Sequence, residues 1–178
     1  IGSAGQALKV NSGANGYEFG SAGQNIVAKT DSTRRATTSS VDLLNVNIVA
    51  TKTNPTIHVV SSIGICASVD SNLDSRNFKF DIRFSVDGGS SYSDGFDDAY
   101  ATDVFAPGGG GRSHTHAYDV MTKLANGSFT ATGASSGTTI NVVVRYDHSS
   151  VTGGETAYIN RSASNGGYMN SSLIVYEE

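Results

Sequence analysis

Apolar and polar residues alternate along much of this chain. In the segment NFKFDIRFSV, the apolar residues Phe78, Phe80, Ile82, Phe84 and Val86 share one face of an extended backbone. A period of two is typical of a strand with one buried face. The same alternation occurs in VDLLNVNIVA, PTIHVVSSIGICASV, TINVVVRYDH and SSLIVYEE. We therefore predict strands over 41–50, 55–69, 77–86, 139–148 and 171–178.

Glycine-rich segments separate the alternating runs and predict turns. SVDGGSS, LANGS and ASSGTT contain the Asp-Gly, Asn-Gly and Ser-Gly pairs that favour tight turns. DGFDDAYATDVF has apolar residues at a spacing that suits one or two helical turns, but no segment predicts a long amphipathic helix. Many short strands with glycine-rich turns indicate an all-β, antiparallel β-sandwich of the jelly-roll kind.

The first 38 residues differ from the rest because they contain few large apolar residues. DSTRRATTSS has the composition of a connector, which predicts a boundary near Ser39. We expect a Gly-rich extended stalk over 1–38 and a jelly-roll head over 39–178. A segment this poor in apolar surface does not fold alone, so it needs partner chains or a neighbouring domain.

Composition excludes several classes of partner. The 178-residue chain has a formal net charge of −4 and no basic stripe, which argues against binding to nucleic acid. Cys66 is the only cysteine, so a disulfide framework and a multi-thiolate zinc site are excluded. No apolar run approaches the roughly 20 residues of a membrane helix, so we expect no membrane insertion.

No motif in the chain predicts an enzyme. The nucleophile elbow Gly-x-Ser-x-Gly and a convincing pair of glycosidase carboxylates are both missing from the sequence. SVDGGSSY, with Ser85, Asp87, Gly89 and Tyr92, resembles the Asp-box of sialidase propellers. A propeller carries several such boxes as hairpin turns, so this single copy is expected to be a hairpin turn.

A repeated phrase near the start carries a resemblance to a family. GSAGQ occurs at 2–6 and again at 20–24. GSAGQALKVNSGANGYEFG resembles a module of the fibres of tailed bacterial viruses, in which Gly-x-x-Gly-Gln precedes a leucine, a polar turn and an aromatic residue. The family often has Trp where Phe19 stands, and the second copy departs from the pattern after Gln24. A flexible linker that repeats by composition is the alternative interpretation.

The resemblance implies a trimeric stalk that leads into a globular head. Three chains would bury the sparse apolar residues around a shared axis, and the candidates are Leu8, Val10, Tyr17 and Phe19. The heads of such stalks are similar to the tumour necrosis factor and complement-type jelly rolls, and SSLIVYEE resembles the last strand of that class. The implied function is a virion structural protein on the particle surface, a homotrimeric fibre or appendage head that meets other virion proteins and a host surface glycan or protein.

Receptor contacts are expected on loops, which tolerate change while the sheets hold their positions. We expect loops over 87–103, 104–116 and 151–168. The candidate contact residues are Tyr92, Phe96, Tyr100, Tyr158, Asn165 and Tyr168.

His114 and His116 share a face if their segment is extended. Two such histidines from each of three chains would surround one transition metal on a threefold axis, which resembles some virus fibres. The alternative, which we favour, is a pair of loop or interface histidines, so no cofactor is predicted.

Two other functions remain open at the level of the sequence. A capsid-surface decoration or head fibre would have a structural role and the same β-rich, symmetric character. A secreted carbohydrate-binding β-sandwich module would also share the fold, although the chain has no Trp for the flat platforms that dominate sugar binding in such modules.

Overall fold

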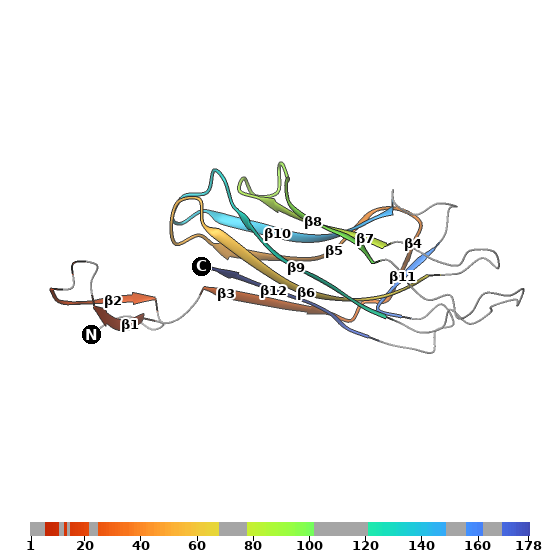
Figure 1. Ribbon diagram of the computed structural model, residues 1–178, viewed down its shortest axis with the longest axis horizontal. Coiled ribbons are helices and arrows are strands. Elements are labelled where there is room, and N and C mark those ends of the chain that lie inside the picture. Colours follow the sequence, from red (N-terminus) through yellow and green to blue (C-terminus); the bar gives the residue numbers. More distant parts are fainter. Residues whose placement is uncertain are drawn as a thin grey trace, which may run out of the picture.

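The computed structural model describes residues 6–10, 13, 15–21, 25–67, 78–101, 121–148, 156–161 and 169–178. Within these ranges the regular structure consists of strands, which form a β-sandwich preceded by a hairpin (Figure 1). The strands are β1 (Gln6–Val10), β2 (Tyr17–Ser21), β3 (Ile26–Asp31), β4 (Arg35–Thr37), β5 (Val41–Val49), β6 (Thr56–Ala67), β7 (Phe78–Ser85), β8 (Ser93–Ala101), β9 (Met121–Thr130), β10 (Thr139–Asp147), β11 (Ala157–Ile159) and β12 (Ser171–Glu177).

Two antiparallel sheets face each other in the sandwich. Sheet one has the order β5-β10-β7-β8. Sheet two has the order β3-β12-β6-β11-β4, and β9 pairs with the other edge of β6. Because β6 pairs with β12 along one half and with β11 along the other, β12 and β11 together fill one strand position. In the same way β3 and β4 together form the outer edge of sheet two.

The chain passes repeatedly from one sheet to the other, which makes the sandwich a jelly roll. From β5 in sheet one it enters β6 in sheet two, returns for β7 and β8, enters sheet two for β9, returns for β10, and ends in sheet two with β11 and β12. Pairing therefore joins segments far apart in the sequence, such as β3 with β12. Closing a two-sheet Greek-key fold requires such pairings.

The core lies between the sheets and is built from the alternating residues that the sequence predicts. Ile57, Ile63, Phe80, Ile82 and Tyr146 are fully buried. Their polar neighbours along each strand point outward, as a strand with one buried face requires. The predicted strands over 41–50, 77–86, 139–148 and 171–178 thus correspond to β5, β7, β10 and β12, and the predicted strand over 55–69 corresponds to β6.

Two segments predicted as turns or loops are strands. The LANGS segment lies inside β9, and DGFDDAYA belongs to β8, which pairs with β7. Gly127 of the LANGS segment has the ring of Phe96 directly against it, because an added Cβ would lie 2.9 Å from that ring. The glycine is needed for this close approach between strands, not for a turn.

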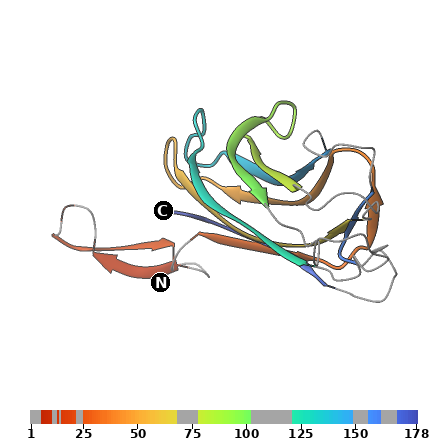
Figure 2. The same cartoon turned by 45° about the vertical axis from the view of Figure 1, so that its right-hand side comes forward.

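Two strands of the sandwich, β3 and β4, lie before the boundary predicted near Ser39. Ile26–Asp31 pairs with β12 and Arg35–Thr37 pairs with β11, so both strands belong to the head. Their apolar residues are few because edge strands bury little surface. The segment before them forms the β1–β2 hairpin, which projects from the end of the sandwich where β3 begins (Figures 1 and 2).

In the ranges given above, no helix is long and apolar enough to cross a membrane.

Candidate functional site

The two outer faces of the sandwich differ in chemistry. On sheet two, the outward residues of β3, β12, β6 and β9 line up in cross-strand rows. The rows are Ile26–Tyr176–His58–Ser128, Ala28–Ile174–Val60–Asn126 and Thr30–Ser172–Ser62–Leu124. None of these positions holds Asp, Glu, Lys or Arg, and Ile26, Val60, Leu124 and Ile174 are exposed large apolar side chains. We call these rows the uncharged face.

His58 lies at one corner of the uncharged face. Its ring stacks on Tyr176 with centroids 4.8 Å apart, and its Nε2 lies 2.9 Å from Glu178 Oε2. Tyrosine is enriched and charged residues are depleted in the cores of protein interfaces, so this composition suits contact with another protein surface.

The outer face of sheet one carries charges and amides instead. Asn141 Nδ2 donates a hydrogen bond to Asn47 Oδ1 at 2.7 Å, and Arg145 forms an ion pair with Asp42 at 3.3 Å. Between these rows lies Val143, whose register partners are Asn45 and Arg83. Val143 points out of the sandwich, yet it is only 2% exposed. The side chains around it therefore cover this apolar point on a polar face.

Tyr92 lies near Val143 on the outer face of sheet one. Both its hydroxyl group and its ring contact neighbouring side chains. Its hydroxyl donates to Asn141 Oδ1 at 3.0 Å, and the Arg83 guanidinium lies 5.0 Å from its ring centroid. A Cβ added to Gly89 would come within 3.2 Å of the same hydroxyl. The ring is thus fixed on the sheet and does not swing with a free loop.

The β7–β8 turn that presents Tyr92 is organised by Asp87. The Asp87 carboxylate accepts hydrogen bonds from the Ser85 hydroxyl at 2.6 Å and from the backbone N–H groups of Ser90 and Ser91 at 3.0 Å. Gly88 and Gly89 adopt φ values of 75° and 90°, which glycine adopts without strain. The Asp-box-like segment is therefore a hairpin turn, as the sequence predicts.

Replacing Asp87 by alanine is expected to lower the urea midpoint of unfolding and to loosen Tyr92. The hydrogen bonds from Ser85 and Ser91 hold the pKa of Asp87 well below its ordinary value of 3.8. A lowered pKa in the folded state adds stability above the ordinary pKa that is lost as the pH falls below it. The difference between Asp87→Ala and the native chain should consequently shrink in acid. Asp94→Ala, at an exposed position of β8, is the control and should leave the midpoint unchanged.

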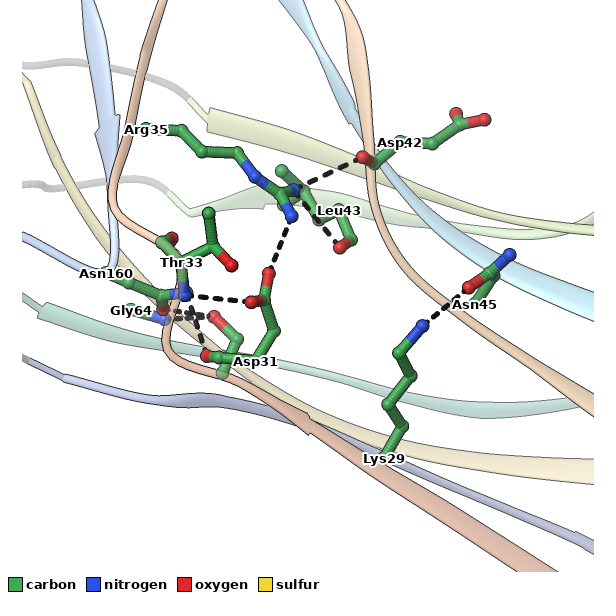
Figure 3. A network of polar contacts seen from close by, with 10 residues as sticks. Lys29, Asp31, Thr33, Arg35, Asp42, Leu43, Asn45, Gly64 and Asn160 are labelled. Atoms are coloured by element: carbon green, nitrogen blue, oxygen red, sulfur yellow. Dashed lines mark hydrogen bonds and ion pairs between the residues drawn. The ribbon is translucent and has the colours of Figure 1, made fainter.

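A second polar network closes the edge of the sandwich between β3–β4 and β5 (Figure 3). Arg35 forms an ion pair with Asp31 at 2.7 Å and donates to the backbone oxygen of Leu43 at 3.2 Å. Asn160 Nδ2 donates to the backbone oxygens of Asp31 and Thr33, which fixes the bend between β3 and β4. Arg35 therefore satisfies backbone acceptors at the edge of sheet one.

Asp31 stays ionised within this network. Burial opposes its charge, but the hydrogen bonds from Thr33 and the charges of Arg35 and Lys29 outweigh burial and lower its pKa. Lys29 Nζ donates to Asn45 Oδ1 at 2.8 Å, so β3 reaches β5 at a second point (Figure 3).

A pocket of about 240 Å³ opens where these networks meet, and we call it the β5 pocket. Its lining combines cationic, amide, aromatic and aliphatic groups. The lining residues are Lys29, Arg35, Asp42, Leu43, Leu44, Asn45, Tyr92 and Val143.

The predicted contact residues do not gather in one place. Tyr92 lines the β5 pocket. Phe96 packs against the core from strand β8 and does not lie in a loop as predicted. Tyr100 also belongs to strand β8 and not to a loop. Tyr158 lies on β11, with its ring 4.9 Å from the Arg161 guanidinium.

Only some of the remaining predicted site residues belong to the described part of the chain. Asn165, Tyr168, His114 and His116 lie outside the described residues. In the described part of the chain, no group of three or more His, Cys, Asp or Glu could hold a metal ion. Of the stalk candidates, Leu8 pairs with Phe19 and Val10 pairs with Tyr17 in the β1–β2 hairpin, and Leu8, Val10 and Tyr17 are exposed.

Lys29, Arg35, Asn45 and Asn141 were not among the predicted site residues. They come from segments as much as 112 positions apart, and each has an ordinary polar identity at its own place in the sequence. Only the outward parity of Asn45 and Asn141 in predicted strands could have indicated that they face solvent together.

No protein-family model matches the chain, and no curated protein matches it either. Among solved structures, the chain is similar to the infectious bursal disease virus VP2 subviral particle, with 10% identity, a TM-score of 0.38, and coverage of 97% of this chain and 42% of that one. It is also similar to the infectious bursal disease virus Gx strain structure, with 11% identity, a TM-score of 0.41, and coverage of 96% of this chain and 40% of that one. The chain spans about two fifths of these viral chains. Likeness at this level carries no conclusion about function.

Proposed function

We propose that this chain is a non-enzymatic virion structural protein, the head of a homotrimeric fibre or appendage that contacts the host surface. The jelly-roll sandwich and the GSAGQ repeat, which resembles the stalk module of bacterial-virus fibres, support this role. The observation that carries it is the uncharged face of sheet two.

The uncharged face has the composition of a surface that another protein covers. The cores of protein interfaces are depleted in charged residues, and contiguous exposed apolar patches mark interaction sites. The opposite face of the same sandwich carries Asp42, Arg145 and Arg83, so charge is not scarce in this chain as a whole. Because the difference follows the two faces, we infer that copies of the chain pack against sheet two.

The β1–β2 hairpin supports the same conclusion. In this hairpin Leu8 lies opposite Phe19, and Val10 lies opposite Tyr17. An isolated two-stranded hairpin is marginally stable in water, and it gains stability when its apolar side is covered. Neighbouring copies in a symmetric assembly would supply that cover, and the number three comes from the resemblance of the stalk.

A trimeric head would bind its receptor by avidity. Each copy contributes one site, and linked sites turn weak contacts into firm attachment when the geometry allows simultaneous engagement. To reach a receptor, such a head would lie at the particle surface, attached to other virion proteins.

Introducing a charge into the uncharged face is expected to break the assembly. Val60 is 41% exposed and faces outward from β6, so Val60→Lys should leave the fold intact and dissociate a trimer into monomers. Val49→Lys is the matched control, because Val49 is 52% exposed on the outward side of β5 in sheet one. The measurement is the solution mass by light scattering, with the urea midpoint as a check on folding.

A native chain that stays monomeric at high concentration would contradict the proposal, as would a Val60→Lys variant that remains trimeric. A monomer would favour a secreted binding module instead.

A further inference from the structure

The β5 pocket has too many polar groups to be a packing defect. Arg35 forms an ion pair with Asp31, and Asp42 forms one with Arg145, so these charges stabilise the structure around the pocket. Lys29 differs from them, since its ammonium donates only to a neutral amide oxygen of Asn45 among the contacts of the described residues. An ammonium has three donor hydrogens, which leaves capacity for an anionic ligand.

The pocket lining holds two cations, Lys29 and Arg35, and one anion, Asp42, although the chain carries a net charge of −4. Lys29 and Arg35 line the pocket, and Arg83 lies over the ring of Tyr92. Neither Lys29 nor Arg83 has an ion pair within the described part of the chain. Lys29 lines the opening. It favours a ligand with a carboxylate, because charge-assisted hydrogen bonds to lysine are stronger than neutral ones.

The remaining lining suits a sugar ring. Tyr92 offers a fixed aromatic ring, and Asn45 supplies an amide for hydroxyl groups. A pyranose has an apolar face of C–H groups and a polar rim, which matches an aromatic body with polar groups around it. A pocket of about 240 Å³ is smaller than the roughly 300–1,000 Å³ of pockets for drug-sized ligands, so it has room for one sugar unit.

We propose that the β5 pocket binds one hexuronic acid unit of a surface polysaccharide. The carboxylate lies at Lys29 Nζ, and the sugar ring packs against Tyr92. This inference rests on the proposed function in one respect, since it names the ligand class of a host-contacting head. Lys29 points to the opposite side of β3 from Ala28 and Thr30 of the uncharged face, so binding and assembly can be tested separately.

The test is a titration of the native chain with sodium glucuronate, followed by NMR chemical shifts, with glucose and sodium acetate titrated at the same ionic strength. We expect saturable shifts at Tyr92 and Lys29 with a millimolar Kd for glucuronate, and much weaker binding of glucose and acetate. Equal binding of acetate would identify a general anion site and overturn the sugar assignment. The lack of saturable shifts with glucuronate would overturn the proposal altogether.

Three variants separate the two halves of the site. Lys29→Gln is expected to weaken glucuronate binding about tenfold while leaving the weak response to glucose unchanged. Tyr92→Ala should weaken both, whereas Tyr92→Phe keeps the ring and should bind glucuronate nearly as well as the native chain. An unchanged affinity in Lys29→Gln would overturn the assignment of the carboxylate.

Lys52→Gln is the matched control, because Lys52 is exposed in the β5–β6 loop and does not line the pocket. It should bind glucuronate with native affinity. The solution mass of each variant is measured in parallel. If glucuronate fails to bind while the native chain is a trimer, the ligand is wrong and the assembly stands; if a monomer binds it, the assembly is wrong and the ligand stands.

Discussion

Replacing Glu177 by alanine is expected to cost about 2–3 kcal/mol of the free energy of unfolding, since hydrogen bonds to a charged group are worth roughly 1.5–3 kcal/mol. Glu177 is 5% exposed at the end of β12. Its carboxylate accepts from the Thr51 hydroxyl at 2.8 Å, from the Thr51 N–H at 2.9 Å and from Asn25 Nδ2 at 3.1 Å. One side chain thus ties the last strand to the β5–β6 loop and to the start of β3.

Glu178→Ala provides the matched control for this experiment. The side chain of Glu178 is 73% exposed and pairs with His58 at the surface, so its removal should change the urea-derived free energy little. Equal effects of the two substitutions would contradict the role assigned to Glu177.

The same carboxylate predicts a pH dependence. Burial opposes its ionisation, but the hydrogen bonds from Asn25 and Thr51 outweigh burial and keep the pKa of Glu177 below its ordinary value of 4.5. The unfolded state then binds more protons as the pH falls, so the stabilisation is present above the ordinary pKa and is lost below it. Glu177→Gln should reduce the loss of stability at acidic pH. If the loss is the same in this variant as in the native chain, other carboxylates cause it.

The second large effect is expected at the glycines where β8 and β9 meet. A Cβ on Gly95 would lie 2.9 Å from the Phe129 ring and 3.0 Å from the backbone oxygen of Ile82. A Cβ on Gly127 would lie 2.9 Å from the Phe96 ring. Overpacking typically costs about 1–3 kcal/mol. Gly95→Ala should be the more damaging, because the backbone of a paired strand moves less easily than a ring.

Compensating substitutions distinguish the two glycines. Phe96→Leu removes the ring edge that crowds Gly127, so Gly127→Ala should cost less in that background than in the native chain. Phe129→Leu should not rescue Gly95→Ala, since the Ile82 oxygen remains in place. The free energies of unfolding of the single and double variants are measured in urea. If the effects of Gly127→Ala and Phe96→Leu are strictly additive, Gly127 is not needed for the close approach of the Phe96 ring.

The strands that have one buried and one exposed face could be predicted from the amino-acid pattern alone. Phe80, Ile82 and Phe84 alternate with polar residues, and this period of two depends only on which side of the chain faces water. The turn at Asp87 was also predictable, because its hydrogen bonds and glycine conformations are local. These features led to the antiparallel sandwich.

Features that depend on distant partners could not be predicted from the pattern and follow from how the chain packs. β3 and β4 are strands because β12 and β11 pair with them, and Gly127 lies in a strand because Phe96 of β8 packs on it. The uncharged face and the β5 pocket arise from side chains that strand register brings together. A local pattern of apolar and polar residues does not specify which distant strand a segment pairs with. The same strand sequence can pair with several partners, so pairing and burial depend on the whole fold.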